Sequence, residues 1–269
     1  MSVAAFLRKQ QQVTLAALAL VVALALGYVL FGAGMGMTAL DMTMMPRDMD
    51  MAWPAWSFSY ALVMFVMWWA MMVAMMLPSA VPVILLAAAL NAKAQPGRAP
   101  YGATAWFVAG YLAAWGGFSI AAAAAQWWLS QVRVLAPMLH LSDAHVVASL
   151  LVAAGLWQFT PWKRACLQQC RSPLAFLTGR RRAGNLGALI MGLEHGGYCL
   201  GCCWLLMALL FVGGVMNLFW IGGLAMIVLV EKALPAGERF ARALGAVLLI
   251  CGLAVLMLSE GDALRRVFG

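Results

Sequence analysis

A run of soft metal donors stands near the middle of a long apolar stretch: His195, Cys199, Cys202 and Cys203. Residues three and four apart share one face of a helix, so this spacing places an imidazole and three thiols together. Such a donor set suits Cu(I) or zinc. The alternative is a structural histidine beside inert cysteines, although ionisable groups inside a membrane segment generally mark a functional site. The C-x-x-C-C string also permits thiol–disulfide chemistry.

A second thiol pair, Cys166 and Cys170, lies in a basic segment between apolar stretches. Thiols four apart meet on one helical turn. In a reducing cytosol they would be free thiols, and the neighbouring Arg164 and Arg171 favour the thiolate form that binds metals. The pattern predicts a place where an ion is exchanged with a thiol carrier. Surface thiols without a function are the alternative, because a lone C-x-x-x-C is not specific.

Methionines form a stripe along the second apolar stretch. Helical spacing puts most of them on one face, and thioethers are soft ligands that select Cu(I) without losing a proton. Packing is the alternative, since methionine is also a common core residue. The stripe is followed by Pro78 and Pro82. Its members are Met64, Met67, Met71, Met72, Met75 and Met76.

A further group of methionines precedes that stretch, in a polar loop with acidic residues: Met42, Met44 and Met45, with Met49 and Met51 beyond them. Water-exposed thioethers predict capture of Cu(I). The alternative is a loop that buries these side chains against the membrane face. His140 and His145 do not share a helical face and are expected to be weak ligands.

These candidate ligands must be positioned by membrane helices. Of the 269 residues, 65% are apolar and only 10% are charged, with a mean hydropathy of +0.92. A soluble domain cannot keep that much apolar surface from water. The long Ala- and Leu-rich runs exclude an outer-membrane barrel. We therefore expect an all-α, polytopic transmembrane bundle, a single domain over 1–269. Its seven spans are predicted at about 13–31, 57–86, 103–129, 144–159, 186–212, 215–230 and 240–258.

The net charge of +8 is interpreted as a topology signal. With a cytoplasmic N-terminus, most of the 17 Lys and Arg residues fall in cytoplasmic segments, chiefly 161–185. Nucleic acid is excluded as a partner on this basis. Glu231 and Lys232 are expected at the cytoplasmic interface, an ordinary position for charged residues. The predicted location is the bacterial inner (cytoplasmic) membrane, crossed several times.

Three motifs resemble a family of bacterial integral membrane proteins described as predicted metal-binding, with a domain of unknown function. They are the Met-rich Trp69–Ser79 segment, C-L-x-x-C-R-S-P at Cys166–Pro173, and G-x-x-H-G-x-Y-C-x-G-C-C-W-x-x-M at Gly192–Met207. The resemblance covers about 53–258. It implies a membrane protein that binds a metal.

The leading prediction is Cu(I) transport or delivery, with methionines passing the ion to the Cys/His site. The metal is predicted to be copper, with zinc as the alternative. The expected partners are the metal ion, the lipid membrane, and a cytosolic thiol carrier or a membrane subunit. Two other functions remain open: a membrane thiol–disulfide oxidoreductase, and a non-catalytic subunit that assists metalloprotein assembly. No nucleotide-binding loop of the G-x-x-x-x-G-K-[ST] type is present, which argues against ATP-driven pumping.

Overall fold

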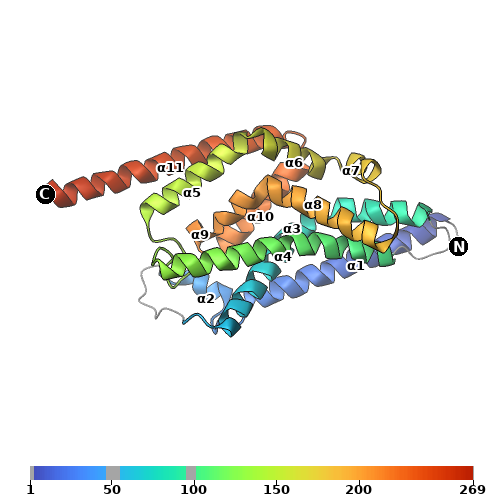
Figure 1. Cartoon of the computed structure of the whole chain (residues 1–269), viewed down its shortest axis with the longest axis horizontal. Coiled ribbons are helices and arrows are strands. Elements are labelled where there is room, and N and C mark those ends of the chain that lie inside the picture. Colours follow the sequence, from blue (N-terminus) through green and yellow to red (C-terminus); the bar gives the residue numbers. More distant parts are fainter. Residues whose placement is uncertain (1–2, 47–54, 95–100, 269) are drawn as a thin grey trace.

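The computed structural model describes residues 3–46, 55–94 and 101–268, and every regular element in these ranges is a helix (Figure 1). Extended pairing in them is limited to an isolated bridge between Leu135 and Leu141. The helices are α1 (Val3–Leu30), α2 (Ala39–Met44), α3 (Phe58–Ala94), α4 (Tyr101–Gln131), α5 (Ala144–Phe159), α6 (Pro161–Arg171), α7 (Pro173–Gly179), α8 (Gly184–Ala208), α9 (Leu210–Gly213), α10 (Leu218–Ala233) and α11 (Gly237–Phe268).

The prediction of an all-helical fold is confirmed, but the seven-span count is not. Five helical segments are long and apolar enough to cross a membrane: Gln10–Leu30, Phe58–Ala92, Tyr101–Gln131, Gly184–Gly213 and Gly237–Ser259. The predicted spans 144–159 and 215–230 correspond to α5 and α10, which have 16 residues each. A helix of that length extends only about 24 Å, against a hydrocarbon core of about 30 Å. Joining α5 to α6 across their 65° bend raises the count to six.

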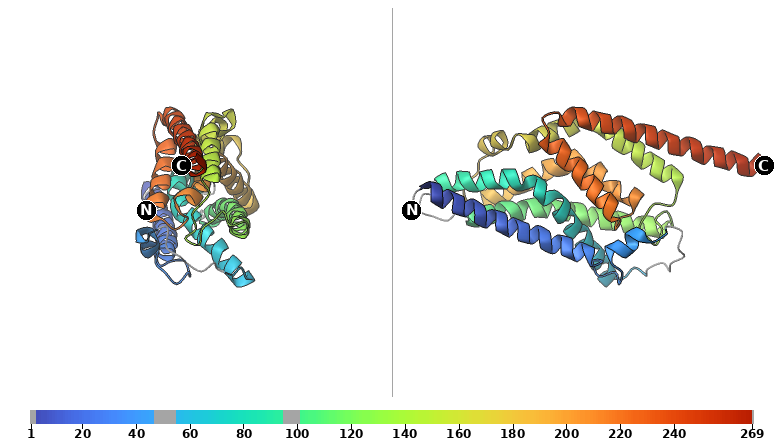
Figure 2. Two further views of the ribbon diagram at one scale, coloured as in Figure 1. Left: turned by 90° about the vertical axis from the view of Figure 1, so that its left-hand side faces the viewer. Right: turned by 180° about the vertical axis from the view of Figure 1, so that it is seen from behind.

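Helices α4 and α8 form the most extensive helix pair, and glycines permit their close approach. A Cβ at Gly110 would overlap the backbone of α8, and a Cβ at Gly192 would overlap the backbone of Phe107. Small residues let helix backbones approach in this way. Helix α1 packs along α3, and α11 packs along α5 before extending past it to the C-terminus (Figure 2).

The bend between α5 and α6 folds α6 back onto α8. Thr160 and Pro161 supply the local cause. The Thr160 side chain accepts a hydrogen bond from Lys163 N at 3.2 Å, and Pro161 occupies the first turn of α6. Threonine as an N-cap and proline in the first turn both favour the start of a new helix. The cysteines of α6 are thereby brought beside those of α8.

Candidate metal centre

Cys199 lies at the centre of a polar contact between four helices. Its side chain is buried, with 1% exposure. The Tyr111 hydroxyl of α4 is 3.1 Å from its Sγ, and the Lys232 Nζ of α10 donates to the same sulfur at 3.0 Å. The neighbouring Lys232 ammonium group favours the thiolate form of Cys199.

The contacts of Cys199 close into a ring through α3. The Tyr111 hydroxyl donates to the backbone oxygen of Met76 at 3.0 Å, and Ser79 Oγ donates to the same oxygen at 2.8 Å. Lys232 Nζ then donates to Ser79 Oγ at 3.0 Å. This ring lies at the proline-containing part of α3, where Pro78 and Pro82 lack the amide donors of a regular helix. It fixes Cys199 relative to α3, α4 and α10.

The other cysteines of the motif gather around Cys199. The thiols of Cys202 and Cys203 both donate to the Cys199 carbonyl oxygen at 3.0 Å. From α6, the Cys170 side chain interacts electrostatically with those of Cys199 and Cys202. Cys166 packs against Gly201, where an added Cβ would lie 2.7 Å from its Sγ. The two cysteine motifs, separate in the sequence, therefore make one cluster of free thiols, which we call the thiol centre: Cys166, Cys170, Cys199, Cys202 and Cys203.

His195 lies one helical turn before Cys199 but is enclosed by aromatic rings. The ring centroid of Phe176 is 5.1 Å from that of the imidazole, and those of Phe107 and Tyr111 are about 6 Å away. The imidazole is 3% exposed, and its Nδ1 has no hydrogen-bond partner. Burying a polar nitrogen without a hydrogen bond is energetically costly. Because Nδ1 makes no hydrogen bond, its lone pair remains able to bind a metal ion.

The thiol centre would need to rearrange to chelate a metal ion with three or more ligands. Within the described ranges, no three His, Cys, Asp or Glu side chains converge on a geometry that could hold a metal. The Cys202 and Cys203 thiols are instead engaged with a backbone oxygen. Metal binding to a thiol removes its proton, which abolishes those two donated hydrogen bonds. The donor set is soft and suits Cu(I).

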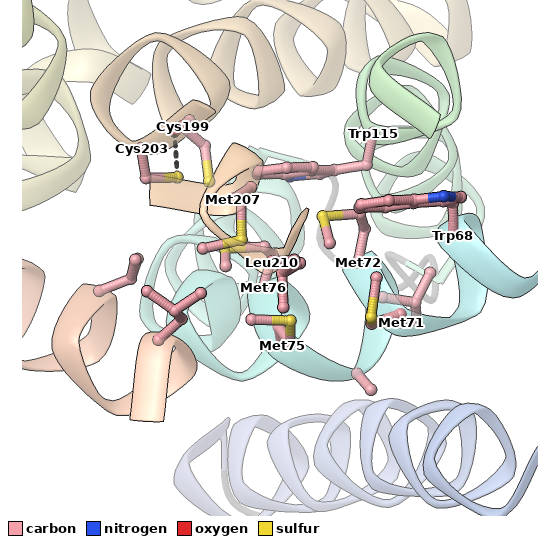
Figure 3. Packing of buried hydrophobic residues seen from close by; sticks show 14 of the residues in the cluster. Trp68, Met71, Met72, Met75, Met76, Trp115, Cys199, Cys203, Met207 and Leu210 are labelled. Atoms are coloured by element: carbon pink, nitrogen blue, oxygen red, sulfur yellow. Dashed lines mark hydrogen bonds between the residues drawn. The ribbon is translucent and has the colours of Figure 1, made fainter. Parts of the chain in front are cut away.

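The methionine stripe of α3 is buried beside the thiol centre. Met64, Met67, Met71, Met72 and Met76 have no exposed surface, and Met75 is 6% exposed. In Figure 3, Met76 and Met207 lie between the thiols of α8 and Met75. Met64 differs from the others because its sulfur accepts a hydrogen bond from Gln126 Nε2 at 3.0 Å. The placement fits both the ligand and the packing interpretations.

The methionines expected to capture copper lie on and next to the short helix α2. Met42 and Met45 are half-buried, whereas Met44 is 65% exposed. Met49 and Met51 lie outside the described residues. The hydroxyl of Thr43, between Met42 and Met44, accepts a hydrogen bond from Leu218 N at 2.9 Å, which attaches α2 to the start of α10.

Sequence reasoning missed the charged residues that surround the centre. Glu231 and Lys232 were expected at the cytoplasmic interface, but Glu231 is 1% exposed and pairs with Lys163 at 2.7 Å, while Lys232 reaches Cys199. The position of Glu231 and Lys232 at the end of a short apolar segment could have indicated that their side chains are buried near the centre. Buried charges in membrane segments usually indicate function. Tyr111 carried no signal, because nothing in its sequence neighbourhood distinguishes it.

The fold and the centre together define an all-helical protein with membrane-length segments and a buried cluster of thiols next to thioethers. The model of the PpoB2 family of copper chaperones matches residues 65–255, and the chain belongs to this family. The matched range contains the whole thiol centre, Lys232 and the stripe from Met67 onward. No curated protein and no solved structure matches the chain.

Proposed function

We propose that this protein is a membrane-embedded chaperone that binds Cu(I) at the thiol centre and delivers it to a partner. The observation that supports the proposal most directly is the contact of buried Cys199 with Lys232, beside the thiols of Cys202 and Cys203. Membership of a copper chaperone family agrees with it.

Charge balance agrees with Cu(I) bound by two thiolates at this position. Two thiolates around Cu(I) carry a net charge of −1, which the Lys232 ammonium neutralises. Zinc with four thiolates would carry −2 and leave an uncompensated charge, whereas zinc with one imidazole and three thiolates would carry −1, as the Cu(I) site does. An unbalanced charge is expensive in a low-dielectric interior. His195 Nδ1, one turn away, is the further ligand that a small side-chain movement could recruit.

The methionine stripe supports a route to the thiol centre. Met71, Met72, Met75 and Met76 belong to the same core cluster as Met207 and Cys199, and Met76 lies beside Met207 (Figure 3). Thioethers bind Cu(I) without deprotonation and exchange it readily, so they suit transfer better than storage. In this proposal, Met42, Met44 and Met45 collect the ion, and Met64, Met67 and the rest of the stripe pass it inward. The direction of flow is left open.

The proposed setting is the bacterial inner membrane, with the N-terminus in the cytoplasm. The five membrane-length helices support a membrane location. Cys166 and Cys170 are more exposed than the thiols of α8, so they are the cysteines an acceptor reaches first. The acceptor is a cytosolic thiol carrier or a membrane partner subunit.

Copper content of single variants tests the thiol centre. The protein is purified in detergent under reductant, loaded with Cu(I), and equilibrated with a Cu(I) chelator. We expect Cys199→Ser and Cys202→Ser each to lose most of the bound copper and His195→Ala to lose much of it. Cys251→Ser is the matched control, because Cys251 lies on the exposed side of α11. Full copper retention by folded Cys199 and Cys202 variants would contradict the proposal.

The same preparation separates delivery from redox chemistry. A thiol–disulfide oxidoreductase would keep its activity in the presence of the chelator and would cycle between thiols and a disulfide. A copper chaperone loses its function with the chelator and retains bound metal under reductant. An assembly subunit that binds no copper would fail both assays.

The methionine route is tested by Met71→Leu/Met75→Leu. Leucine keeps volume and apolarity, so a packing role tolerates the change. A ligand role does not, because leucine has no lone pair to offer. We expect slower loading of the thiol centre by Cu(I) in reconstituted vesicles. Unchanged loading at equal expression would show that the stripe is packing.

A further inference from the structure

A second group of thioethers surrounds a small cavity at the end of the helices where α2, α9 and α10 meet. The cavity, of about 40 Å³, is lined by sulfur-bearing side chains and one imidazole. Its volume admits an ion with a water molecule but no organic ligand. We call it the methionine cavity; its lining residues are Met42, Thr43, Met45, Met138, His140, Gly213, Gly214, Met216 and Asn217.

The donors of the methionine cavity come from three segments that are distant in sequence. Met42 and Met45 belong to α2 and its C-cap, Met138 and His140 to the connection before α5, and Met216 to the turn before α10. Methionine packing would fill the space between such segments. Here the side chains leave a cavity between them, although Met216 is only 2% exposed.

Hydrogen bonds that do not involve the thioethers fix the walls of the cavity. Val215 N donates to the Leu139 oxygen at 3.1 Å, and Leu141 N donates to the Phe211 oxygen at 2.8 Å. Leu139 is held at a φ of +59°, in the left-handed region that a branched side chain rarely adopts. Such strain persists only where surrounding contacts determine the backbone. The donors are thus presented by a preorganised frame, which reduces the entropic cost of binding.

The methionine cavity is separate from the thiol centre. Gly213 lines the cavity and follows Cys203, the last cysteine of the thiol centre, by 10 residues, which corresponds to about 15 Å along a helix. Neither His195 nor any cysteine lines the cavity. An ion bound there would therefore have a donor set of thioethers and imidazole, without thiolates.

We propose that the methionine cavity is a second Cu(I) site, held by thioethers together with the His140 imidazole. The choice of metal rests on the proposed copper function, whereas the site itself does not depend on the thiol centre. Soft, uncharged thioethers select Cu(I) and exclude hard divalent cations such as magnesium. The proposal adds Met138, Met216 and His140 to the groups that handle copper.

Counting bound ions in matched variants tests the proposal. In chelator competition with Cu(I), we expect Met42→Leu/Met216→Leu to bind one ion fewer than the parent. Met226→Leu is the control, because Met226 lies on α10 but is 59% exposed, does not line the cavity and has no proposed role in copper binding. The Cys199→Ser/Cys202→Ser protein should keep the cavity ion. A full complement of copper in the Met42→Leu/Met216→Leu variant, or an equal loss in Met226→Leu, overturns the inference.

The two proposals can fail independently. If the Cys199→Ser/Cys202→Ser variant loses no copper while the Met42→Leu/Met216→Leu variant loses one ion, the proposed metal site at the thiol centre is wrong and the site in the methionine cavity is supported. If only the cysteine variant loses copper, the reverse holds.

A measurement on the unaltered chain avoids any folding defect in the variants. Silver(I) is a redox-inert substitute for Cu(I), and a bound thioether resists oxidation to the sulfoxide. Peptide mass spectrometry after peroxide treatment should find Met42 and Met138 protected by silver(I), with the exposed Met226 oxidised to the same extent with or without it. Equal oxidation of Met42 and Met138 in both conditions contradicts a site in the cavity.

Discussion

Replacing Gly192 by alanine should separate α4 from α8 and disturb the thiol centre. A Cβ at Gly192 would lie 2.8 Å from the carbonyl carbon of Phe107 and 3.0 Å from its Cα, with the carbonyl oxygen closer still. Ordinary carbon contacts are about 3.5–4.0 Å, so the two backbones must move apart by about 1 Å. Backbone atoms cannot rotate away as a flexible side chain can. We expect a loss of about 1–3 kcal/mol in stability, the usual range for overpacking.

The same displacement reaches the centre through Tyr111, one helical turn beyond Phe107. Its hydroxyl is 3.1 Å from Cys199 Sγ, and an added 1 Å takes that contact beyond hydrogen-bonding distance. We therefore expect Gly192→Ala to lower both the thermal unfolding midpoint in detergent and the Cu(I) affinity in chelator competition. Gly197→Ala, on the same helix with no atom within 4 Å of the added Cβ, is the control. Equal stability and copper affinity in the two variants would refute the close-packing argument.

Three further outcomes are expected. Glu231→Gln leaves the buried Lys163 ammonium without its partner and should lower the stability by about 3–5 kcal/mol, measured by thermal unfolding. The double variant Lys163→Met/Glu231→Gln should recover part of that stability, and no recovery would argue against a stabilising ion pair. Lys232→Met removes the cation from the thiol centre and should weaken Cu(I) binding about tenfold or more, because a hydrogen bond to a charged group contributes about 1.5–3 kcal/mol. An unchanged Cu(I) affinity would show that Lys232 does not neutralise the charge of the bound thiolates. Reporters fused at Gly179 and after Gly269 should lie on opposite sides of the membrane if α10 crosses it, and on the same side if it does not.

The helices were predictable because hydropathy and helical spacing are local properties. Long apolar runs located each predicted segment, and the i, i+4 relation of Cys199 and Cys203 correctly put them on one buried face. The number of spans was less predictable, because α5 and α10 are too short to cross alone and their roles depend on the bend at Thr160 and on their neighbours.

The composition of the thiol centre depended on tertiary packing. The basic segment 161–185 was interpreted as a cytoplasmic loop, since charge is the strongest local signal there. Within this segment, α6 packs against α8, which brings Cys166 beside Gly201 of the α8 cysteine motif. Lys232 was placed at the interface by its sequence position, but its long aliphatic stem lets the amine extend inward to Cys199. Neither contact leaves a pattern within a single segment.

Helix α6 is fastened at both ends, and this limits how an ion can leave. Lys163 pairs with buried Glu231 near its start, and the Arg171 guanidinium at its end donates to the carbonyl oxygens of Leu234 and Pro235 at 2.8 and 2.6 Å. Helix α6, which carries Cys170, is therefore held in place by contacts at both ends and does not move away from the bundle as a hinged segment would. In the proposed delivery of copper, an incoming thiol would meet half-buried Cys170 before it could reach buried Cys199. Copper would leave by stepwise exchange of ligands, without opening the bundle.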